Sequence, residues 1–222
     1  MPVHQRDADH IHRWLRAAPD AARPPLAGLL LDRDGVLIEF VDYLHRVEEV
    51  RLTAGAGAAI GRLNRAGVPV AVVTNQAGIA RGYYGWAEFD AVEAEIARQL
   101  AGHGAWLDAV YACPHHADGQ GPFRHEDHPD RKPNPGMLRR AARDLRLDLA
   151  HSWLIGDHES DIEAARRAGL AGAVHVDSGY GREHRAAVEA LARSGAVCVR
   201  FAPGLAEAIA LLLPELERAG RG

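Results

Sequence analysis

Two acidic residues, Asp32 and Asp34, follow the apolar run of residues 26–31, and Gly35 permits the chain to turn directly after them. Two neighbouring carboxylates repel each other unless a positive charge lies between them. A bound divalent cation with oxygen ligands is therefore the economical explanation for this pair. A solvated Asp-Gly turn is the alternative interpretation of this fragment taken alone.

Polar groups also follow two other apolar runs. Residues 74–78 read Thr-Asn-Gln-Ala-Gly, and a hydroxyl, an amide and free backbone donors at a strand end would form a neutral anion cradle. A plain capping role for Thr74 is the alternative. Asp157 can reach a metal at the end of its own strand, while Asp161 can cap a helix or fix the loop.

The single lysine of the chain, Lys132, lies in the sequence Arg-Lys-Pro-Asn-Pro, whereas the other 25 of the 26 Lys and Arg residues are arginine. A lysine is a compact point charge, which suits a site where one phosphoryl oxygen lies beside a carboxylate. Survival of one lysine by chance is the alternative, but chance does not explain this position.

Together these groups suit phosphoryl transfer through a covalent intermediate. A carboxylate would attack phosphorus, while a metal ion and the lysine neutralise charge on the phosphoryl oxygens. A carboxylate nucleophile needs no deprotonation at neutral pH. The leaving alkoxide does need a proton, so the neighbouring aspartate is expected to act as general acid and then as base for water.

The elements that must position these groups follow from the spacing of apolar residues. Short apolar runs alternate with stretches of helical spacing, which is typical of a doubly wound α/β domain with a parallel sheet. Such sheets bind ligands at the carboxyl ends of their strands. The predicted strands are residues 26–31, 68–73, 107–112, 153–155, 173–176 and 196–199. The predicted helices are residues 54–66, 86–100, 135–145, 161–168 and 205–213.

Residues 1–25 are predicted to be an N-terminal arm, with at most one short amphipathic turn around Ile11, Trp14 and Leu15. Residues 26–222 form one predicted domain. Its helices and strands consume the intervals between the motifs, so no large cap domain is expected. The loops that must then choose the substrate are residues 39–49, 81–85 and 112–130, and the contact residues expected there include Tyr43, His45, Arg81, Tyr83 and Tyr84.

The composition of the 222-residue, 24.0 kDa chain is that of one soluble domain, with 47% hydrophobic and 25% charged residues. A formal charge of -4 lacks the basic excess that nucleic-acid or membrane-surface binding needs, so neither partner is expected. A cytoplasmic location follows because the sequence shows no membrane span and no signal peptide. We expect a monomer or a small homo-oligomer. Two cysteines are too few for a disulfide framework.

The motifs at residues 32–36, 74–76, 131–133 and 156–157, together with Asp161, resemble the four motifs of the haloacid dehalogenase (HAD) phosphatase superfamily, in order. Three longer stretches, residues 74–82, 113–116 and 131–138, resemble those of the heptose-bisphosphate and histidinol-phosphate phosphatases. The resemblance covers residues 26 to 180 and implies a Rossmann-like core.

The resemblance implies roles for three aspartates. Asp32 would be the nucleophile and Asp34 the general acid and base. Mg²⁺ would be held by the carboxylates of Asp32 and Asp157 and by the main-chain carbonyl of Asp34. His158 stands where these phosphatases often carry lysine, and Ile38 replaces a frequent asparagine, so the sugar preference can differ.

The resemblance also implies a set of substrate contacts. Thr74 and Asn75 would bind phosphate, Lys132 would hold both the phosphate and the nucleophile, and Arg131 would contact the substrate. We add Arg81 as a substrate contact because it follows the predicted phosphate cradle.

The function implied is that of a Mg²⁺-dependent phosphomonoester hydrolase acting on a small phosphorylated sugar, namely the 7-phosphate of a heptose 1,7-bisphosphate. A histidinol-phosphate phosphatase or a broader sugar phosphatase is an alternative within the same class. A phosphomutase and a non-catalytic phosphosugar-binding domain are alternatives of other classes. The missing cap argues against the mutase, which must exclude water.

The histidine-rich loop at residues 112–130 is a candidate zinc site. The resembling heptose phosphatases bind a structural zinc here through Cys-x-His and Cys-x-Cys. In this chain the candidate ligands are Cys113, His115, His128 and Asp130. A loop held by hydrogen bonds and packing alone is the alternative, since two thiolates are replaced.

Overall fold

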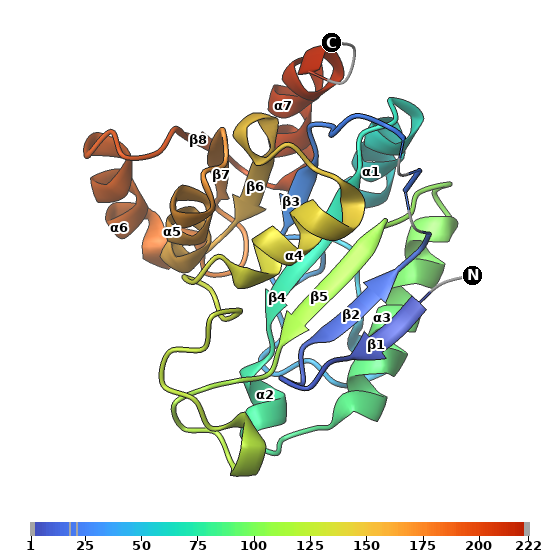
Figure 1. Ribbon diagram of the computed structural model, residues 1–222, viewed down its shortest axis with the longest axis vertical. Helices are drawn as coiled ribbons and strands as arrows, with labels where there is room; N and C mark the ends of the chain where they lie inside the picture. The colour runs from blue at the N-terminus through green and yellow to red at the C-terminus, as the bar shows by residue number, and fades with distance from the viewer. Residues whose placement is uncertain (1–2, 18, 21, 220–222) are drawn as a thin grey trace.

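An eight-stranded sheet with helices on both faces organises residues 3–17, 19–20 and 22–219, the part of the chain that the computed structural model describes (Figure 1). The strands are β1 (Val3–Arg6), β2 (His12–Leu15), β3 (Leu29–Leu31), β4 (Val70–Asn75), β5 (Ala109–Cys113), β6 (Trp153–Gly156), β7 (Gly172–Val176) and β8 (Val199–Ala202). Their order across the sheet is β1-β2-β5-β4-β3-β6-β7-β8, and the six strands from β5 to β8 in this order are parallel. The predicted doubly wound α/β fold is confirmed.

Seven α-helices and three short 3-10 helices connect these strands in the described residues. The α-helices are α1 (Ala56–Arg65), α2 (Ala77–Ala80), α3 (Trp86–Ala101), α4 (Gly136–Leu145), α5 (Glu159–Ala168), α6 (Gly181–Arg193) and α7 (Leu205–Ala219). The 3-10 helices are η1 (Val47–Glu49), η2 (Gly121–Phe123) and η3 (Leu149–His151). The described stretch between β3 and α1 holds only η1 and loops, so it forms no cap domain.

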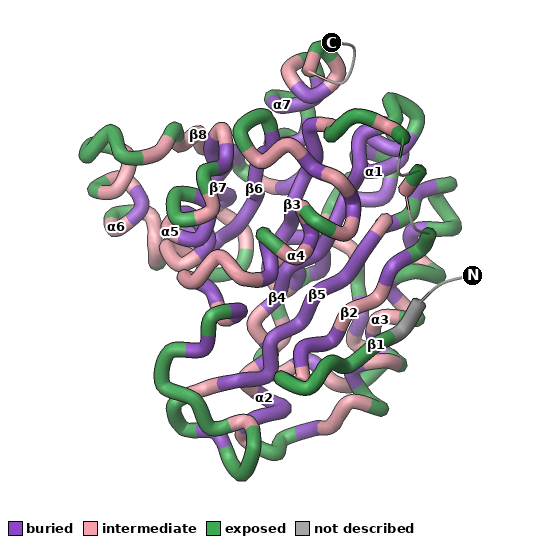
Figure 2. Tube along the Cα trace, in the orientation of Figure 1, coloured by how far each residue is buried: buried purple, intermediate pink, exposed green. Residues whose placement is uncertain are grey.

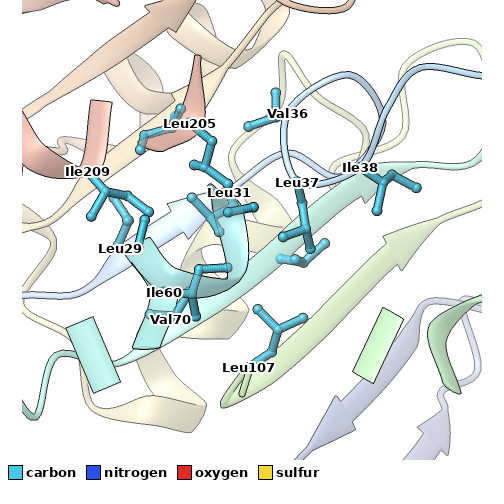
Figure 3. Packing of buried hydrophobic residues seen from close by; sticks show 14 of the residues in the cluster. Leu29, Leu31, Val36, Leu37, Ile38, Ile60, Val70, Leu107, Leu205 and Ile209 are labelled. Carbon is cyan, nitrogen blue, oxygen red and sulfur yellow. The ribbon is translucent and has the colours of Figure 1, made fainter. Parts of the chain in front are cut away.

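The core has two halves because side chains alternate between the faces of each strand. Leu29 and Leu31 pack on the face covered by α1, α3 and α7, while Leu30 packs on the face covered by α4, α5 and α6. Figure 3 shows Ile60 of α1 and Ile209 of α7 beside Leu29 and Leu31. Burial on both faces explains why the central strands, purple in Figure 2, are continuous apolar runs in the sequence.

Two elements depart from the predicted ranges. The last strand was expected at residues 196–199, whereas β8 covers Val199–Ala202. β8 is an edge strand, and the charged residue Arg200 interrupts its apolar run, so the sequence pattern of this strand is weak. The guanidinium carbon of Arg200 lies 4.5 Å from the centre of the Trp153 ring. α6 was not predicted, because it buries only Gly181 and Val188, and one large apolar side chain is too few to show a helical face in the sequence.

The predicted N-terminal arm contains β1 and β2, which form an antiparallel hairpin that extends the sheet beside β5. The short amphipathic turn expected around Ile11, Trp14 and Leu15 is wrong: residues 12–15 form a strand, and Ile11 just before it and Leu15 at its end are buried on the α4 face. A four-residue separation fits the two-residue period of a strand as well as a helical turn. Residues 1–2, 18 and 21 of the arm lie outside the described residues, and the domain boundary at residue 26 stays a prediction.

Among the described residues, none of the helices has the length and apolar character needed to cross a bilayer.

Candidate active site

The predicted catalytic groups meet at one edge of the sheet because they follow neighbouring strands. Asp32 follows β3, Thr74 lies near the end of β4, and Asp157 follows β6, on either side of β3 in the sheet. The loop before α4 brings Lys132 to the same edge. A cavity of about 990 Å³ opens there and is lined by all four residues. Its location confirms the rule for ligand sites in such sheets.

Lys132 bridges two carboxylates that line this cavity, the partly buried Asp32 and the buried Asp161. Its Nζ lies 2.7 Å from Oδ1 of Asp32 and 2.6 Å from Oδ1 of Asp161. The other oxygen of Asp161 accepts a hydrogen bond of 3.1 Å from the backbone N–H of His158 and so caps α5. Asp161 therefore fixes both the start of α5 and the position of the lysine.

Burial and mutual repulsion disturb the titration of these groups. Burial raises the pKa of Asp32 to about 6. The positive charge of Lys132 opposes this rise, and the negative charge of Asp161 adds to it. Burial and the charges of Asp32 and Asp161 raise the pKa of Asp157 to about 8. Burial by itself would lower the pKa of Lys132, but the negative charges of Asp161 and Asp32 have the larger effect, so the pKa of Lys132 is raised. One lysine does not neutralise three acids, so the cluster has an excess of negative charge.

The cluster fits a magnesium ion. Carboxylate oxygens of Asp32, Asp157 and Asp161 lie within 4.8 Å of one another, and an all-oxygen donor set is what Mg²⁺ prefers. The surroundings leave room only for glycine: a Cβ on Gly35 or Gly179 would lie 2.5 or 2.0 Å from Oδ2 of Asp157. Asp161 was not among the predicted ligands, and its bond to Lys132 explains its presence in the group.

Asp34 faces a network of polar side chains. Gln76 donates from Nε2 to Oδ2 of Asp34 at 2.8 Å and to Oγ1 of Thr74 at 2.8 Å. Arg33 donates to both carboxylate oxygens of Asp34, at 3.0 and 3.1 Å. The predicted general acid and the predicted phosphate ligand Thr74 are thus joined through one amide.

Asn75 has a second task beside its predicted contact with phosphate. Its amide exchanges two hydrogen bonds of 3.0 Å with the backbone N–H and C=O of Lys132. This pairing ties the loop before α4 to the end of β4, and it therefore places the lysine. The phosphate contact of Asn75 stays a prediction.

Comparison with known proteins agrees with this geometry. Residues 130–202 match the HAD-hydrolase-like family. The D-glycero-beta-D-manno-heptose-1,7-bisphosphate 7-phosphatase of Mesorhizobium japonicum is 46% identical over 165 residues, which cover 74% of this chain and 76% of that protein. The chain belongs to the HAD-like phosphatases. It is accordingly a phosphoric monoester hydrolase.

Solved structures of HAD-like phosphatases share the fold. A HAD-like phosphatase from Mesorhizobium loti has a TM-score of 0.80 at 38% identity, covering 96% of this chain and 95% of that one. D,D-heptose 1,7-bisphosphate phosphatase from B. bronchiseptica, complexed with magnesium and phosphate, has a TM-score of 0.73 at 34% identity, covering 86% and 99%. Phosphatases of this family use Mg²⁺, as that complex illustrates.

The rim of this phosphatase site contains one of the two predicted arginines. Arg131 lines the cavity and donates from Nη1 to the backbone oxygen of His115 at 3.0 Å. Arg81 does not line the cavity; it donates to the hydroxyl of Tyr43, which does, and lies 3.4 Å from Asp118. Of the aromatic residues expected on the rim, Tyr43 and Tyr84 line the cavity.

Sequence reasoning missed the aromatic pair of Phe40 and Tyr180, whose ring centres lie 4.5 Å apart at the cavity. The backbone N–H of Tyr180 also donates to Oδ2 of Asp157 at 2.8 Å. The signal was available, because Tyr180 follows β7 just as the other site residues follow their strands.

The four candidate zinc ligands of the loop between β5 and α4 do not form one cluster. His115 and His128 stack with ring centres 3.9 Å apart, and Sγ of Cys113 lies 3.9 Å from Nδ1 of His128. Asp130 instead accepts two hydrogen bonds from Arg140, at 2.8 and 2.9 Å. Burial raises the pKa of the Cys113 thiol to about 12, which disfavours the thiolate that a metal needs.

Proposed function

We propose that this phosphatase removes the 7-phosphate of D-glycero-D-manno-heptose 1,7-bisphosphate with Mg²⁺ as cofactor, through an aspartyl-phosphate intermediate. The observation that carries the chemistry is the placement of Lys132 between Asp32 and Asp161 beside Asp157. The names of the relatives support the choice of substrate.

In the proposed mechanism Asp32 is the nucleophile and Asp34 moves the proton. A carboxylate oxygen of Asp32 attacks phosphorus, the P–O bond to the sugar breaks, and its electron pair leaves with the sugar oxygen. Asp34 gives that oxygen a proton. Water then attacks the phosphorus of the aspartyl phosphate and gives a proton to Asp34. The P–O bond to Asp32 breaks, its electron pair returns to the Asp32 carboxylate, and phosphate is released.

The other site residues hold the phosphoryl group and the nucleophile. Lys132, at hydrogen-bond distance from Asp32, balances charge on a phosphoryl oxygen beside it. The hydroxyl of Thr74 and the N–H groups at the end of β4 donate to the phosphate. Asp32 and Asp157, with the main-chain carbonyl of Asp34, would hold Mg²⁺, which when bound supplies positive charge against the phosphoryl oxygens.

The charge balance of the cavity favours a substrate with a second anionic group. Three Arg or Lys side chains line it among the described residues: Arg33, Arg131 and Lys132. Arg33 and Lys132 pair with carboxylates, whereas Arg131 donates to a neutral carbonyl. Burial, with the like charge of Arg81 adding to it, lowers the pKa of Arg131. A phosphate bound beside Arg131 would interact favourably with its charge.

The test is phosphate release from a panel of substrates. The panel contains both anomers of heptose 1,7-bisphosphate, histidinol phosphate and common sugar phosphates, with Mg²⁺ and with a chelator. We expect the heptose bisphosphate to have the highest kcat/KM and the chelator to abolish turnover until Mg²⁺ is restored. A higher kcat/KM for histidinol phosphate would establish the sister function, and return of phosphate to another position of the sugar would establish a mutase.

Zinc in the loop between β5 and α4 stays a prediction with its own assay. Protein purified without a polyhistidine tag would contain about one equivalent of zinc if the loop binds it. The contacts of Asp130 favour the alternative, a loop held by hydrogen bonds and packing.

A further inference from the structure

A buried ion-pair network lies behind Asp34 and has no part in the mechanism described so far. The side chain of Arg33 is 1% exposed. It makes four hydrogen bonds: two to Asp34, one of 3.1 Å to Oε1 of Gln76 and one of 2.9 Å to Oε1 of Glu93. Glu93 belongs to α3, so this helix reaches the catalytic edge through a single guanidinium.

The network fixes the orientation of every group in it. Gln76 donates twice from Nε2, to Asp34 and Thr74, and accepts twice at Oε1, from Arg33 and from the hydroxyl of Tyr84. Turning its amide over would place the NH₂ against two donors and the oxygen against a carboxylate. Arg33 in turn has a planar fork, which contacts both oxygens of Asp34.

We propose that Glu93 is a positioning residue that acts through Arg33 to hold the carboxyl group of Asp34 for proton transfer to the leaving sugar oxygen. This inference rests on the proposed role of Asp34 as general acid. Glu93 anchors the end of the guanidinium that points away from Asp34, at Nη1. Without that anchor Nη1 loses the carboxylate that it contacts, and only the bonds of Nε and Nη2 to Asp34 and Gln76 still orient the guanidinium. The fork on Asp34 is then held less firmly.

The leaving group distinguishes this role from a merely structural one. When the P–O bond of a sugar phosphate breaks, the electron pair goes to an alkoxide oxygen that must take the proton of Asp34. When the same bond breaks in p-nitrophenyl phosphate, the phenolate leaves without that proton. The aspartyl phosphate is common to both substrates, so a difference in kcat/KM reports the first step alone.

The experiment compares Glu93→Ala with the wild type on heptose 1,7-bisphosphate and on p-nitrophenyl phosphate. We expect kcat/KM to fall about 10-fold on the sugar phosphate and to change less than about 2-fold on the aryl phosphate. Glu93→Gln, which still accepts a hydrogen bond from Arg33, should recover most of the loss. Glu95→Ala is the matched control on the same helix, since Glu95 pairs with Arg98, and it should leave both rates unchanged.

Equal losses on both substrates, or no loss on either, would overturn the inference. If Glu93→Ala does not fold, Arg33→Lys keeps the charge without the fork and must show the same difference between the substrates. Asp34→Asn removes the proposed general acid itself, so it shows the largest difference in kcat/KM loss between the two substrates that this assay can give. Should Asp34→Asn show none, the assignment of the general acid is wrong and the inference falls with it. Wild-type turnover of p-nitrophenyl phosphate and of primary alkyl phosphates, but not of the heptose bisphosphate, would instead refute only the proposed substrate, and a primary alkyl phosphate would then replace it in the comparison.

Discussion

The carboxyl edge of the parallel strands and the loop between β5 and α4 both gather titratable side chains, but they hold them differently. At the strand edge the predicted catalytic groups contact one another, as Lys132 contacts Asp32 and Asp161. In the loop, which is largely green in Figure 2, His115 and His128 stack on each other. The strand ends therefore bring the predicted catalytic groups into direct contact, whereas in the loop the carboxylate of Asp130 pairs with Arg140 of α4 and not with the other candidate zinc ligands.

Asp32→Asn should cause the largest loss of activity. A small loss would contradict the view that the strand edge, and not the loop, holds the catalytic groups. The amide keeps the size of the side chain but cannot attack phosphorus, so we expect kcat to fall at least about 10⁴-fold. Phosphate release measures the loss. An unchanged far-UV circular dichroism spectrum is the control for folding, and residual activity near the wild-type level would refute the nucleophile.

Lys132→Arg should cost less but still most of the activity. The side chain of Lys132 is 3% exposed and lies between two carboxylates, so the wider guanidinium must displace one of them. We expect kcat/KM to fall about 100-fold or more, which steady-state kinetics checks. Arg139→Lys, an exposed change on α4, is the matched control. A fully active Lys132→Arg variant would show that charge alone matters at this position.

Arg131→Met tests the boundary between the two regions, because Arg131 lies where the loop meets the cavity. Loss of its charge should raise KM for the bisphosphate about 10-fold or more and leave KM for a sugar monophosphate nearly unchanged. Kinetics on both substrates measures this difference. Equal changes would place the second phosphate elsewhere on the rim.

Asp130→Asn should have the smallest effect on catalysis. Asp130 is buried and accepts two hydrogen bonds from Arg140, so its loss should cost about 1–3 kcal/mol of the free energy of unfolding. The corresponding drop in Tm is about 2–10 °C, with kcat within about 2-fold of the wild type. Glu126→Gln, an exposed change in the same loop, is the control. If the purified wild type contains zinc and the Asp130→Asn variant does not, Asp130 is a zinc ligand and the metal site is supported instead.

The sequence was sufficient to predict the catalytic edge because strand, turn and functional group are adjacent in the chain. Asp32 had to lie at the end of an apolar run, and neighbouring parallel strands had to bring Asp157 beside it. The bond between Arg33 and Glu93 could not be predicted in this way, since it joins residues that are 60 positions apart through the packing of α3. α6 was missed for a different reason, because it buries only Gly181 and Val188 and therefore offers few large apolar side chains from which a helical face could be recognised.

The hairpin of β1 and β2 has a consequence for how the phosphatase behaves in solution. Without it, β5, an entirely buried and apolar strand, would form the rim of the sheet with unpaired backbone groups. Such rims recruit strands from other molecules and promote aggregation. The hairpin replaces that rim with β1, whose Gln5 and Arg6 are exposed. Removing residues 1–16 should therefore make the protein self-associate, even though every predicted catalytic residue is still present.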